Sequence, residues 1–459
     1  MTTTPLDSAT LARYDKPGPR YTSYPTAVEF NEDFTAETYA SRLRLLGPEQ
    51  CISLYMHLPF CQERCDFCGC YVVATRKREI GARYLEYLEK EMKLVRSHLP
   101  ARPAVIQYHW GGGTPTYFDP DQLRQLNETV RKYFAILPDA ERAIEIDPRV
   151  TTHEHIDLLI ELGFNRLSMG VQDFDPKVQQ AIGRHQTEEQ TRSLYDYCRD
   201  KGFKSINIDL VYGLPGQTPD SFSRTLASVL MLRPNRLALY SYAHVPWVRG
   251  NQKRIDTDLL PSRDDKLEIF ARAARAFSTS GYRQIGMDHF ALPEDELSRA
   301  LDSGSLHRNF MGYTVHRTPN MIGLGLSAIG EVYNSYAQNV KKLSTYYAAL
   351  DAGDLPVEKG YSLDRDDRIR RHVITTLMCN GQLKFAEIDS AFGIRFTDYF
   401  QLELKELKGD DIGSELLEVS SSGLQATELG QIFIRNISMV FDRYLREKQR
   451  DKPMFSRTV

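Results

Sequence analysis

The sequence lacks the features of a membrane-spanning, exported or strongly charged protein. Within its 459 residues no stretch approaches the about 18 consecutive apolar residues of a transmembrane helix. Its 58 Lys and Arg nearly balance 61 Asp and Glu, for a net charge of −3, which does not favour nucleic acid or an anionic membrane as partner. The opening segment MTTTPLDSAT has neither the basic nor the apolar part of a signal peptide. We therefore expect a cytoplasmic protein that binds neither membrane nor nucleic acid.

Cysteine is scarce and unevenly placed. The chain has seven cysteines, of which Cys61, Cys65, Cys68 and Cys70 form one tight cluster. An odd total with one cluster, in a chain expected to stay in a reducing compartment, argues against a disulfide framework. The cluster instead indicates metal ligation or redox chemistry. The three other cysteines are expected to be small buried hydrophobic residues: Cys51, Cys198 and Cys379.

Short apolar segments alternate with longer helical patterns through the first half of the chain, without long repeats or low-complexity tracts. The predicted strands are Ile52–Leu58, Ala104–Trp110, Ala143–Asp147, Arg166–Gly170, Ser205–Val211 and Leu237–Tyr242. The predicted helices between them are Ala82–Ser97, Asp121–Phe134, His153–Leu162, Glu188–Lys201 and Pro219–Leu232. Regular β-then-α order predicts right-handed crossovers and a parallel sheet, here an α/β fold with a partial (β/α)6 barrel. A further run, Tyr282–Phe290, is a candidate for extending the sheet.

The two ends of the chain differ from this pattern and suggest three parts. Residues 1–50 form an N-terminal arm, either an ordered segment or a flexible leader, because the prolines and glycine of Lys16–Thr26 forbid a continuous helix there. Residues 51–360 form the catalytic domain, in which Met321–Gly330 is predicted to be a close-packed loop or an approach of backbone to a ligand. Residues 361–459 form a mostly helical, winged-helix-like cap, with a hairpin at Leu416–Ala426 and then a helix at Glu428–Arg446. The nearly balanced charge of this part favours docking or covering a site over reading DNA.

Polar and glycine-rich motifs follow the predicted strands in succession. HLPFC, GGGTP, EIDP, MGVQDF, DLVYGLPG and YAHVP each lie at or just after the carboxyl end of a strand. Barrels and open α/β sheets place their chemistry at that edge. Turns collect glycine and proline in any protein, but the mixed polar residues of six successive motifs favour a functional rim.

The cysteines are spaced as CxxxCxxC, from Cys61 to Cys68. Thiolates are soft ligands that suit zinc or an iron–sulfur cluster. A structural zinc site usually pairs such a knuckle with a second one, and no histidine or other cysteine has matching spacing. The alternative is a 4Fe–4S cluster with three cysteine ligands, which leaves one iron open to a cofactor. Spacing alone leaves both metals possible.

The cysteine motif and the glycines after the second strand resemble the radical S-adenosylmethionine (SAM) superfamily. More narrowly, the chain is similar to the oxygen-independent coproporphyrinogen III oxidases. The matching features are GPRYTSYPT, CxxxCxFCGC, HWGGGTPTY, EIDPR, NRLSMGVQDF, NIDLVYGLPGQT, MDHFA, LHRNFMGYT and RNISMVFDRYL. They extend from residue 18 to beyond residue 440, so the resemblance covers nearly the whole chain.

The resemblance implies a radical reaction in haem synthesis. Reduction of the cluster would cleave SAM to a 5′-deoxyadenosyl radical, with the protein supplying orientation and exclusion of water. Two propionates of coproporphyrinogen III would become vinyl groups, giving protoporphyrinogen IX. An electron donor such as flavodoxin or ferredoxin and a monomeric chain are expected. The alternatives are a haem-binding chaperone without oxidase activity, disfavoured by Cys70 and the arm, and a zinc-bearing regulator, disfavoured by the balanced charge of the cap.

The resemblance also assigns residues to roles. Cys61, Cys65 and Cys68 would be the cluster ligands, and Cys70 a catalytic thiol that does not ligate the cluster. The first SAM would contact Tyr55, Gly112 and Glu145. A second SAM would contact Phe67, Gly113, Thr114, Gln172, Arg184, Asp209, Ala243 and Ile329, with Arg184 at the methionine carboxylate and Asp209 at the ribose.

The substrate brings four propionates, which require a cationic or amide-rich lining. The candidates are Arg20 in the arm and the run His307, Arg308 and Asn309. Four aromatic residues could face the macrocycle, although half-buried core positions are the more ordinary interpretation of each: Tyr108, Trp110, Tyr242 and Phe310.

Overall fold

A computed structural model describes residues 8–409, 412–447, 455 and 457. The chain divides by packing into two compact units. The barrel unit comprises Phe30–Leu260 and His316–Ser362, and the arm-and-cap unit comprises Met1–Glu29, Pro261–Val315 and Leu363–Val459. This division differs from the expected segments 1–50, 51–360 and 361–459 in two ways: residues 30–50 pack with the barrel unit, and residues 261–315 pack with the rest of the arm and the cap. In the described part of the chain, no helix has the length and apolar character needed to cross a membrane.

Six parallel strands form the centre of the barrel unit, in the order predicted from the sequence. They are β1 (Ile52–Leu58), β4 (Ala104–Gly112), β5 (Ala135–Ile146), β6 (Arg166–Gln172), β7 (Ser205–Tyr212) and β8 (Arg236–Ser241). Each strand pairs in parallel with the next along the chain. The predicted α/β fold with a partial barrel of six β/α repeats is therefore confirmed.

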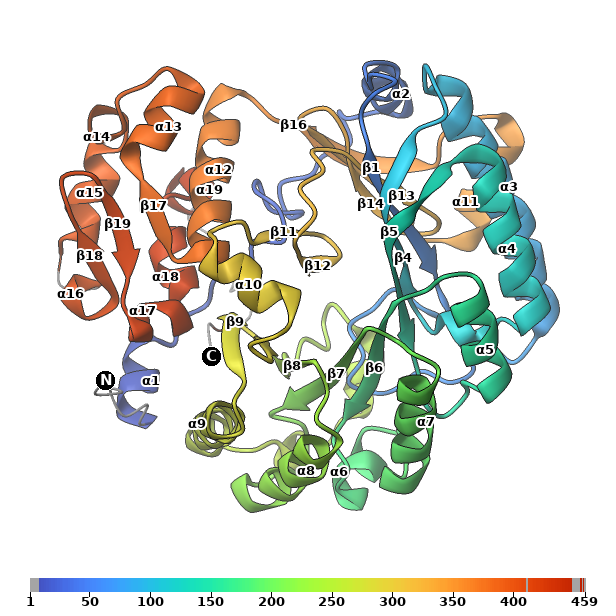
Figure 1. The fold of residues 1–459 in the computed structure, drawn as a ribbon, viewed down its shortest axis with the longest axis horizontal. Coiled ribbons are helices and arrows are strands. Elements are labelled where there is room, and N and C mark those ends of the chain that lie inside the picture. Colours follow the sequence, from blue (N-terminus) through green and yellow to red (C-terminus); the bar gives the residue numbers. More distant parts are fainter. Residues whose placement is uncertain (1–7, 410–411, 448–454, 456, 458–459) are drawn as a thin grey trace. The chain divides into compact units, whose positions relative to one another are not determined.

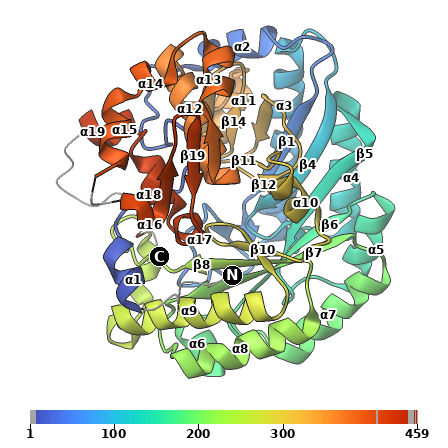
Figure 2. The same cartoon turned by 60° about the vertical axis from the view of Figure 1, so that its left-hand side comes forward.

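Helices cover the outer side of this curved sheet, as Figure 1 shows. The crossover helices are α3 (Arg78–His98), α4 (Pro120–Tyr133), α5 (His153–Glu161), α6 (Pro176–Ala181), α7 (Glu188–Asp200) and α8 (Pro219–Leu232). Figure 2 shows α5, α7 and α8 alongside β6 and β7. Local sequence fixes where several of them begin: Asp119, Thr152 and Thr218 each close a capping box at a helix N-terminus.

The prediction of a close-packed loop at Met321–Gly330 is only partly right, because residues 325–328 form a turn but two strands flank it. β13 (Met321–Leu324) pairs in parallel with β1, and the antiparallel strands β14 (Ile329–Glu331), β15 (Ser335–Asn339) and β16 (Val357–Ser362) follow. The glycines serve close packing of backbone, since a Cβ on Gly323 would lie 2.4 Å from the carbonyl oxygen of Ile329. The remaining elements of this unit are α2 (Ala36–Arg44), β2 (Phe60–Cys61), β3 (Val73–Ala74), η1 (Pro115–Tyr117), η2 (Gly250–Arg254), η3 (Thr257–Leu259) and α11 (Leu343–Ala352).

The arm-and-cap unit combines short helices with small antiparallel sheets. Its first elements are α1 (Ser8–Tyr14), α9 (Arg263–Thr279), β9 (Arg283–Gly286), β10 (His289–Ala291), α10 (Glu296–Asp302), β11 (His307–Asn309) and β12 (Gly312–Thr314). The run Tyr282–Phe290 thus forms an antiparallel hairpin of β9 and β10 rather than a further parallel strand. The polypeptide reverses within Gly286–His289, too short a span for a parallel crossover.

The C-terminal part has the order of helices and hairpin expected of a winged-helix-like domain. Its elements are α12 (Arg365–Asn380), β17 (Gln382–Lys384), α13 (Phe385–Phe392), α14 (Phe396–Tyr399), α15 (Gln401–Leu407), α16 (Gly413–Leu416), β18 (Leu417–Val419), β19 (Gly423–Ala426), α17 (Glu428–Ile432), α18 (Ile434–Met439) and α19 (Arg443–Glu447). The predicted hairpin is formed by β18 and β19, and β17 pairs with β19 as the third strand. The single predicted helix Glu428–Arg446 is broken into α17, α18 and α19.

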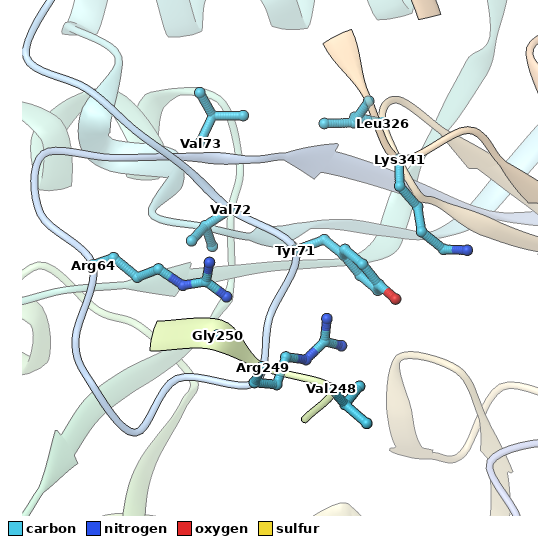
Figure 3. A pocket seen from close by; sticks show the side chains of 9 residues that line it. All are labelled: Arg64, Tyr71, Val72, Val73, Val248, Arg249, Gly250, Leu326 and Lys341. Carbon is cyan, nitrogen blue, oxygen red and sulfur yellow. The ribbon is translucent and has the colours of Figure 1, made fainter. Parts of the chain in front are cut away.

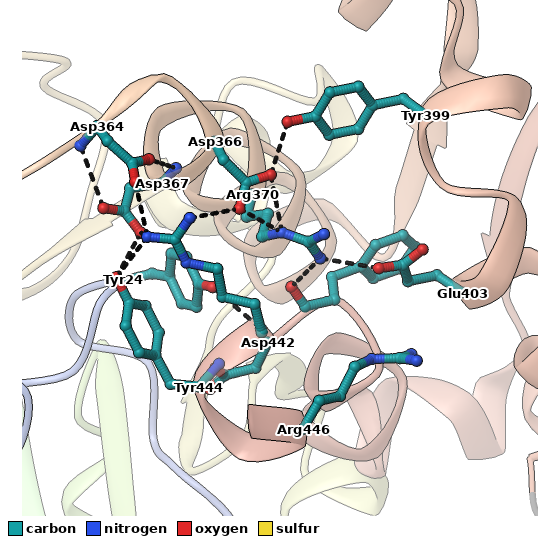
Figure 4. A network of polar contacts seen from close by, with 12 residues as sticks. Tyr24, Asp364, Asp366, Asp367, Arg370, Tyr399, Glu403, Asp442, Tyr444 and Arg446 are labelled. Carbon is teal, nitrogen blue, oxygen red and sulfur yellow. Dashed lines mark hydrogen bonds and ion pairs between the residues drawn. The ribbon is translucent and has the colours of Figure 1, made fainter. Parts of the chain in front are cut away.

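Residues from the last helices hold the N-terminal arm in place. Arg435 is buried and donates to the carbonyl oxygens of Gly18 and Pro19. Tyr21 donates to Asp442 at 3.0 Å, and the ring of Tyr24 lies 5.9 Å from that of Tyr444. Figure 4 shows the polar network around Tyr24 and Asp442 extending to α12 and α15. The arm is therefore an ordered part of its unit rather than a flexible leader.

A buried carboxyl group joins four segments of the barrel unit. Glu91 of α3 accepts hydrogen bonds from the Tyr346 hydroxyl at 2.5 Å, the Gly325 amide at 2.7 Å and the Asn339 side chain at 2.6 Å. Its side chain is almost completely shielded from water. Burial raises the pKa of Glu91 to about 7. The three hydrogen-bond donors favour the ionised form, but their effect is smaller than that of burial.

This raised pKa predicts a pH dependence of stability. The folded protein binds the Glu91 proton more tightly than the unfolded chain does, so the associated stability is complete below pH 4.5 and is lost as pH rises through 7. The loss amounts to about 3 kcal/mol. We expect the melting temperature to fall more steeply between pH 5 and 8 for the native protein than for Glu91→Gln. If the melting temperatures of the two proteins fall equally between pH 5 and 8, the assignment to Glu91 is contradicted.

Candidate functional site

The cysteine loop lies at the carboxyl edge of the parallel sheet, beside a cavity of about 190 Å³. Most of the residues that the sequence assigned to cofactors line this one cavity: Cys61, Cys65, Phe67, Cys68, Cys70, Gly112, Gly113, Thr114, Glu145, Gln172, Arg184 and Asp209. They come from β2 and the loop after it, from the carboxyl ends of β4, β5 and β6, from the segment between α6 and α7, and from β7. The predicted rim is therefore one site, built from segments distant in sequence.

Each of the three predicted ligand thiols has a polar partner at its sulfur. Cys61 Sγ lies 3.4 Å from the Thr114 hydroxyl, and Cys68 Sγ accepts from the backbone N–H of Cys70 at 3.4 Å. Cys65 Sγ accepts from the guanidinium groups of Arg149 at 3.5 Å and Arg184 at 3.7 Å. Hydrogen bonds to sulfur stabilise thiolates and tune iron–sulfur clusters, so this donor set fits such a cluster.

The three predicted ligand thiols line one cavity. Among the residues that the structure describes, no three His, Cys, Asp or Glu side chains are placed to hold one metal ion together. The thiols differ in acidity, because burial raises the pKa of Cys61 to about 12, whereas hydrogen bonds from Cys70 lower the pKa of Cys68. Ligation of iron would therefore release a proton from Cys61.

Two side-chain amides of η2 hold the cysteine loop. The Asn251 Nδ2 group donates to the carbonyl oxygens of Cys65 at 3.2 Å, Asp66 at 2.9 Å and Cys68 at 3.0 Å. The Gln252 Nε2 group donates to the carbonyl oxygens of Phe67 at 3.0 Å and Ala243 at 3.2 Å. No local pattern indicates a role for these two residues, because such polar residues after a glycine are also typical of an ordinary surface turn.

Asp147 forms a buried ion pair with two arginines on the wall of the cavity. Its carboxylate accepts from Arg149 at 2.7 Å and from Arg184 at 3.1 and 3.2 Å. Burial opposes ionisation, but Arg184 and Arg149 outweigh it and hold the pKa of Asp147 below its ordinary value. Arg184 also donates to Gln186 Oε1 at 2.8 Å and to the Gly170 carbonyl at 2.7 Å. The guanidinium predicted for the methionine carboxylate is thus already engaged by protein groups.

Glu145 and Asp209 provide two separate carboxyl groups in the cavity. Glu145 accepts from the Gly112 amide at 3.0 Å and lies 3.3 Å from His109, and these groups outweigh burial to keep its pKa below the ordinary value. Asp209 accepts from Ser168 and from Asn207, each at 2.8 Å. Burial, together with the charge of Glu145, raises the pKa of Asp209 to about 6. Both groups are therefore largely ionised at neutral pH and can accept hydrogen bonds from hydroxyl groups.

The three glycines at the carboxyl end of β4 are required by the protein's own packing. A Cβ on Gly111 would lie 2.8 Å from the Glu145 carboxyl carbon, and one on Gly112 would lie 2.5 Å from the His57 ring. One on Gly113 would lie 2.6 Å from the backbone of Pro59. Gly112 also has a positive φ of 112°, which a residue with a side chain rarely adopts.

Three of the residues assigned to SAM do not line this cavity. Tyr55 lies next to it, with its hydroxyl 3.0 Å from His57 Nδ1 and its ring 5.7 Å from that of His109. The Ala243 carbonyl oxygen accepts a hydrogen bond from the Gln252 side chain, which also holds the cysteine loop. Ile329 lies at the start of β14, where it pairs with Gln338. The strand partners that place these residues are not apparent from local sequence.

The expectations for substrate contacts have mixed outcomes. Tyr108 and Trp110 are completely buried and pack on Phe164, with ring centroids 5.8 and 4.6 Å from it, so they are core residues and cannot face a macrocycle. In the arm-and-cap unit, Arg20 forms an ion pair with Asp288, and Arg308 donates to the Arg20 carbonyl at 2.8 Å. His307 begins the adjoining strand β11, and Asn309 ends it.

Comparisons with known proteins agree with the site. The model of the radical SAM superfamily matches residues 55–229, and that of the HemN C-terminal domain matches residues 363–433. The oxygen-independent coproporphyrinogen III oxidase of Helicobacter pylori (strain ATCC 700392 / 26695) is 45% identical over 459 residues, covering 99% of both chains. That of Pseudomonas aeruginosa is 44% identical over 459 residues, covering 99% of this chain and 98% of the relative. The solved structure of the Escherichia coli coproporphyrinogen III oxidase, described as a radical SAM enzyme, has a TM-score of 0.89 at 44% identity, covering 93% and 97% of the chains.

The amide of Asn251 gives a test of how the cysteine loop is held. Asn251→Asp keeps the shape of the side chain but replaces the donor to three carbonyls with a repelling carboxylate. At about 1 kcal/mol for each lost bond, we expect roughly 10- to 100-fold faster loss of iron to a chelator. Lys253→Gln, at an exposed position of η2, is the matched control and should lose iron at the native rate. Equal rates for Asn251→Asp and the native protein would show that the amide does not hold the loop.

Proposed function

Because the chain belongs to the oxygen-independent coproporphyrinogen III oxidase family of the radical SAM superfamily, we propose that it converts coproporphyrinogen III to protoporphyrinogen IX in haem synthesis. Two propionate side chains of the substrate become vinyl groups, each with loss of carbon dioxide. The observation that carries the proposal is the cavity that joins three thiols, a glycine-lined turn and two carboxyl groups. A reduced flavodoxin or ferredoxin is the proposed electron donor, and a monomer the proposed state.

The superfamily uses a 4Fe–4S cluster and SAM, and we propose that Cys61, Cys65 and Cys68 hold the cluster. When bound, the cluster and SAM supply the one-electron chemistry that removes hydrogen from a substrate carbon. Arg149 and Arg184 face the Cys65 sulfur, and their positive charge would balance part of the negative charge of a thiolate-ligated cluster.

Glu145 and Tyr55 mark the proposed site of the SAM bound to the cluster. Glu145 is ionised, and its two oxygens can accept the two hydroxyl groups of a ribose. Gly112 lies directly against this carboxylate, so backbone lines the cavity there without a side chain in the way. The cluster-bound SAM would thus lie between the cysteine loop and β5.

A second SAM is proposed at the side of Asp209, with Phe67, Gly113, Thr114, Gln172, Arg184, Ala243 and Ile329 as its surroundings. Asp209 lies on β7 and Glu145 on β5, with β6 between them. The cavity therefore offers two carboxyl groups, one for each ribose. Since Arg184 is engaged with Asp147 and Gln186, we propose that it forms a wall of this second site and positions those groups.

Replacement of single cysteines tests the cluster assignment and the activity together. The anaerobically reconstituted native protein should carry about four irons per chain and form protoporphyrinogen IX from coproporphyrinogen III, SAM and reductant. Each of three variants should lose both the iron and the formation of protoporphyrinogen IX: Cys61→Ser, Cys65→Ser and Cys68→Ser. Cys70→Ser should keep the iron and lose turnover, because Cys70 is an exposed thiol beside the ligands. Stoichiometric zinc in place of iron, or loss of all iron from Cys70→Ser, would contradict these assignments.

The second SAM is tested by equilibrium binding to the protein with intact cluster. The native protein should bind about two SAM per chain, and Asp209→Asn about one, because the neutral amide weakens a hydrogen bond to a charged group. The expected loss of about 1.5–3 kcal/mol is roughly a 10- to 100-fold weaker second affinity. Glu145→Gln is the matched variant and should weaken the other site. A single SAM on the native protein at saturation would refute the second site.

A further inference from the structure

A second cavity of about 220 Å³ adjoins the cofactor site in the barrel unit (Figure 3). It is lined by Arg64, Tyr71, Val72, Val73, Val248, Arg249, Gly250, Leu326 and Lys341. Arg64 and Val72 also line the cavity of the cysteine site, so the two cavities share a wall. A group bound in the second cavity is therefore next to the cofactors.

Three cationic side chains and no acidic side chain line this cavity. The Arg249 guanidinium lies 4.2 Å from the centre of the Tyr71 ring, and in the described part of the chain it has no carboxylate partner. Arg64 donates one hydrogen bond to the Cys70 carbonyl at 3.2 Å, but its Nε, buried from water, has no acceptor among the described residues. Lys341 is paired with Glu358. Two of the three cations thus keep donors that an anionic ligand could use.

The rest of the cavity wall is apolar, which restricts the kind of anion. Val72, Val73 and Leu326 provide aliphatic surface, and Val248, which is 60% exposed, lies at the edge. An alkyl chain that ends in a carboxylate would match both halves of the wall: methylene groups on the valines and oxygens on the guanidiniums. The cavity has room for a group the size of a propionate.

We propose that this cavity binds one propionate carboxylate of the tetrapyrrole substrate, with Arg249 and Arg64 as its ligands. This inference rests on the proposed function, because it names a contact of the same substrate. The shared wall at Arg64 and Val72 would then place the adjoining part of the ring beside the cofactor cavity. Arg249 and Arg64 act here in binding and orienting the substrate, and the predicted residues Arg20 and Arg308 are not needed for this carboxylate.

Binding of coproporphyrin III, the stable oxidised form of the substrate, tests the proposal without turnover. Fluorescence titration of the cluster-containing protein should show roughly 10- to 100-fold weaker binding to Arg249→Gln than to the native protein. The native protein should also bind the tetramethyl ester of coproporphyrin III more weakly than the free acid when both are supplied in detergent micelles. Arg249→Gln should discriminate less between the ester and the acid. Lys253→Gln removes one positive charge from the same segment outside the cavity and should bind as the native protein does.

The outcomes separate this inference from the proposed function. If the native protein converts coproporphyrinogen III but Arg249→Gln binds coproporphyrin III equally well, the propionate site is refuted and the proposed function stands. If Arg249→Gln instead weakens only the interaction with reduced flavodoxin, the surface docks the electron donor and the inference is overturned. If the native protein with intact cluster neither binds coproporphyrin III nor turns over the substrate, the proposed function itself fails. Unchanged iron content and melting temperature in Arg249→Gln would show that the variant is folded.

Discussion

The site depends on one constraint, the common direction of the strands in a parallel sheet. Parallel strands bring their carboxyl ends to the same edge, so functional residues far apart in sequence meet there. Cys61, Glu145 and Asp209 share one cavity for this reason, although each belongs to a different β/α repeat. Within a strand, successive side chains point to opposite faces of the sheet, so core residues and site residues alternate. On β4, Tyr108 and Trp110 pack into the core on one side, whereas His109 reaches Glu145 on the other.

The sequence predicted what local pattern determines. Alternating strands and helices, capping residues and the CxxxCxxC spacing are local signals, and β1 and α8 begin and end at the predicted residues. β13 escaped prediction because the glycine-rich segment that contains it is equally typical of loops, and only its pairing with β1 reveals a strand. Asn251 and Gln252 escaped for a related reason. Their role depends on carbonyl groups of a loop more than 180 positions earlier, and no local pattern encodes such a contact.

Each carboxylate that lines the cavity has nearby groups that stabilise its negative charge. Asp147 lies between Arg149 and Arg184, which also face the Cys65 sulfur, while Glu145 and Asp209 keep their charges through hydrogen bonds from neutral groups or His109. Buried charges are costly unless paired, and Asp147 and Arg184 meet this requirement by pairing with each other. The cysteine loop is thus held on one side by arginines at a sulfur and on the other by amides at its carbonyls.

The anchoring of the arm has a consequence for synthesis of the chain on the ribosome. Tyr21 and its partner Asp442 are separated by 421 positions. At a translation rate of about 5–20 residues per second, the arm emerges roughly 20–80 s before its partner exists. During that interval Tyr21 and Tyr24 lack the residues that cover them in the finished protein, and the barrel unit can complete most of its parallel strands first. The arm-and-cap unit therefore closes last, which makes the nascent arm a natural segment for a chaperone to bind.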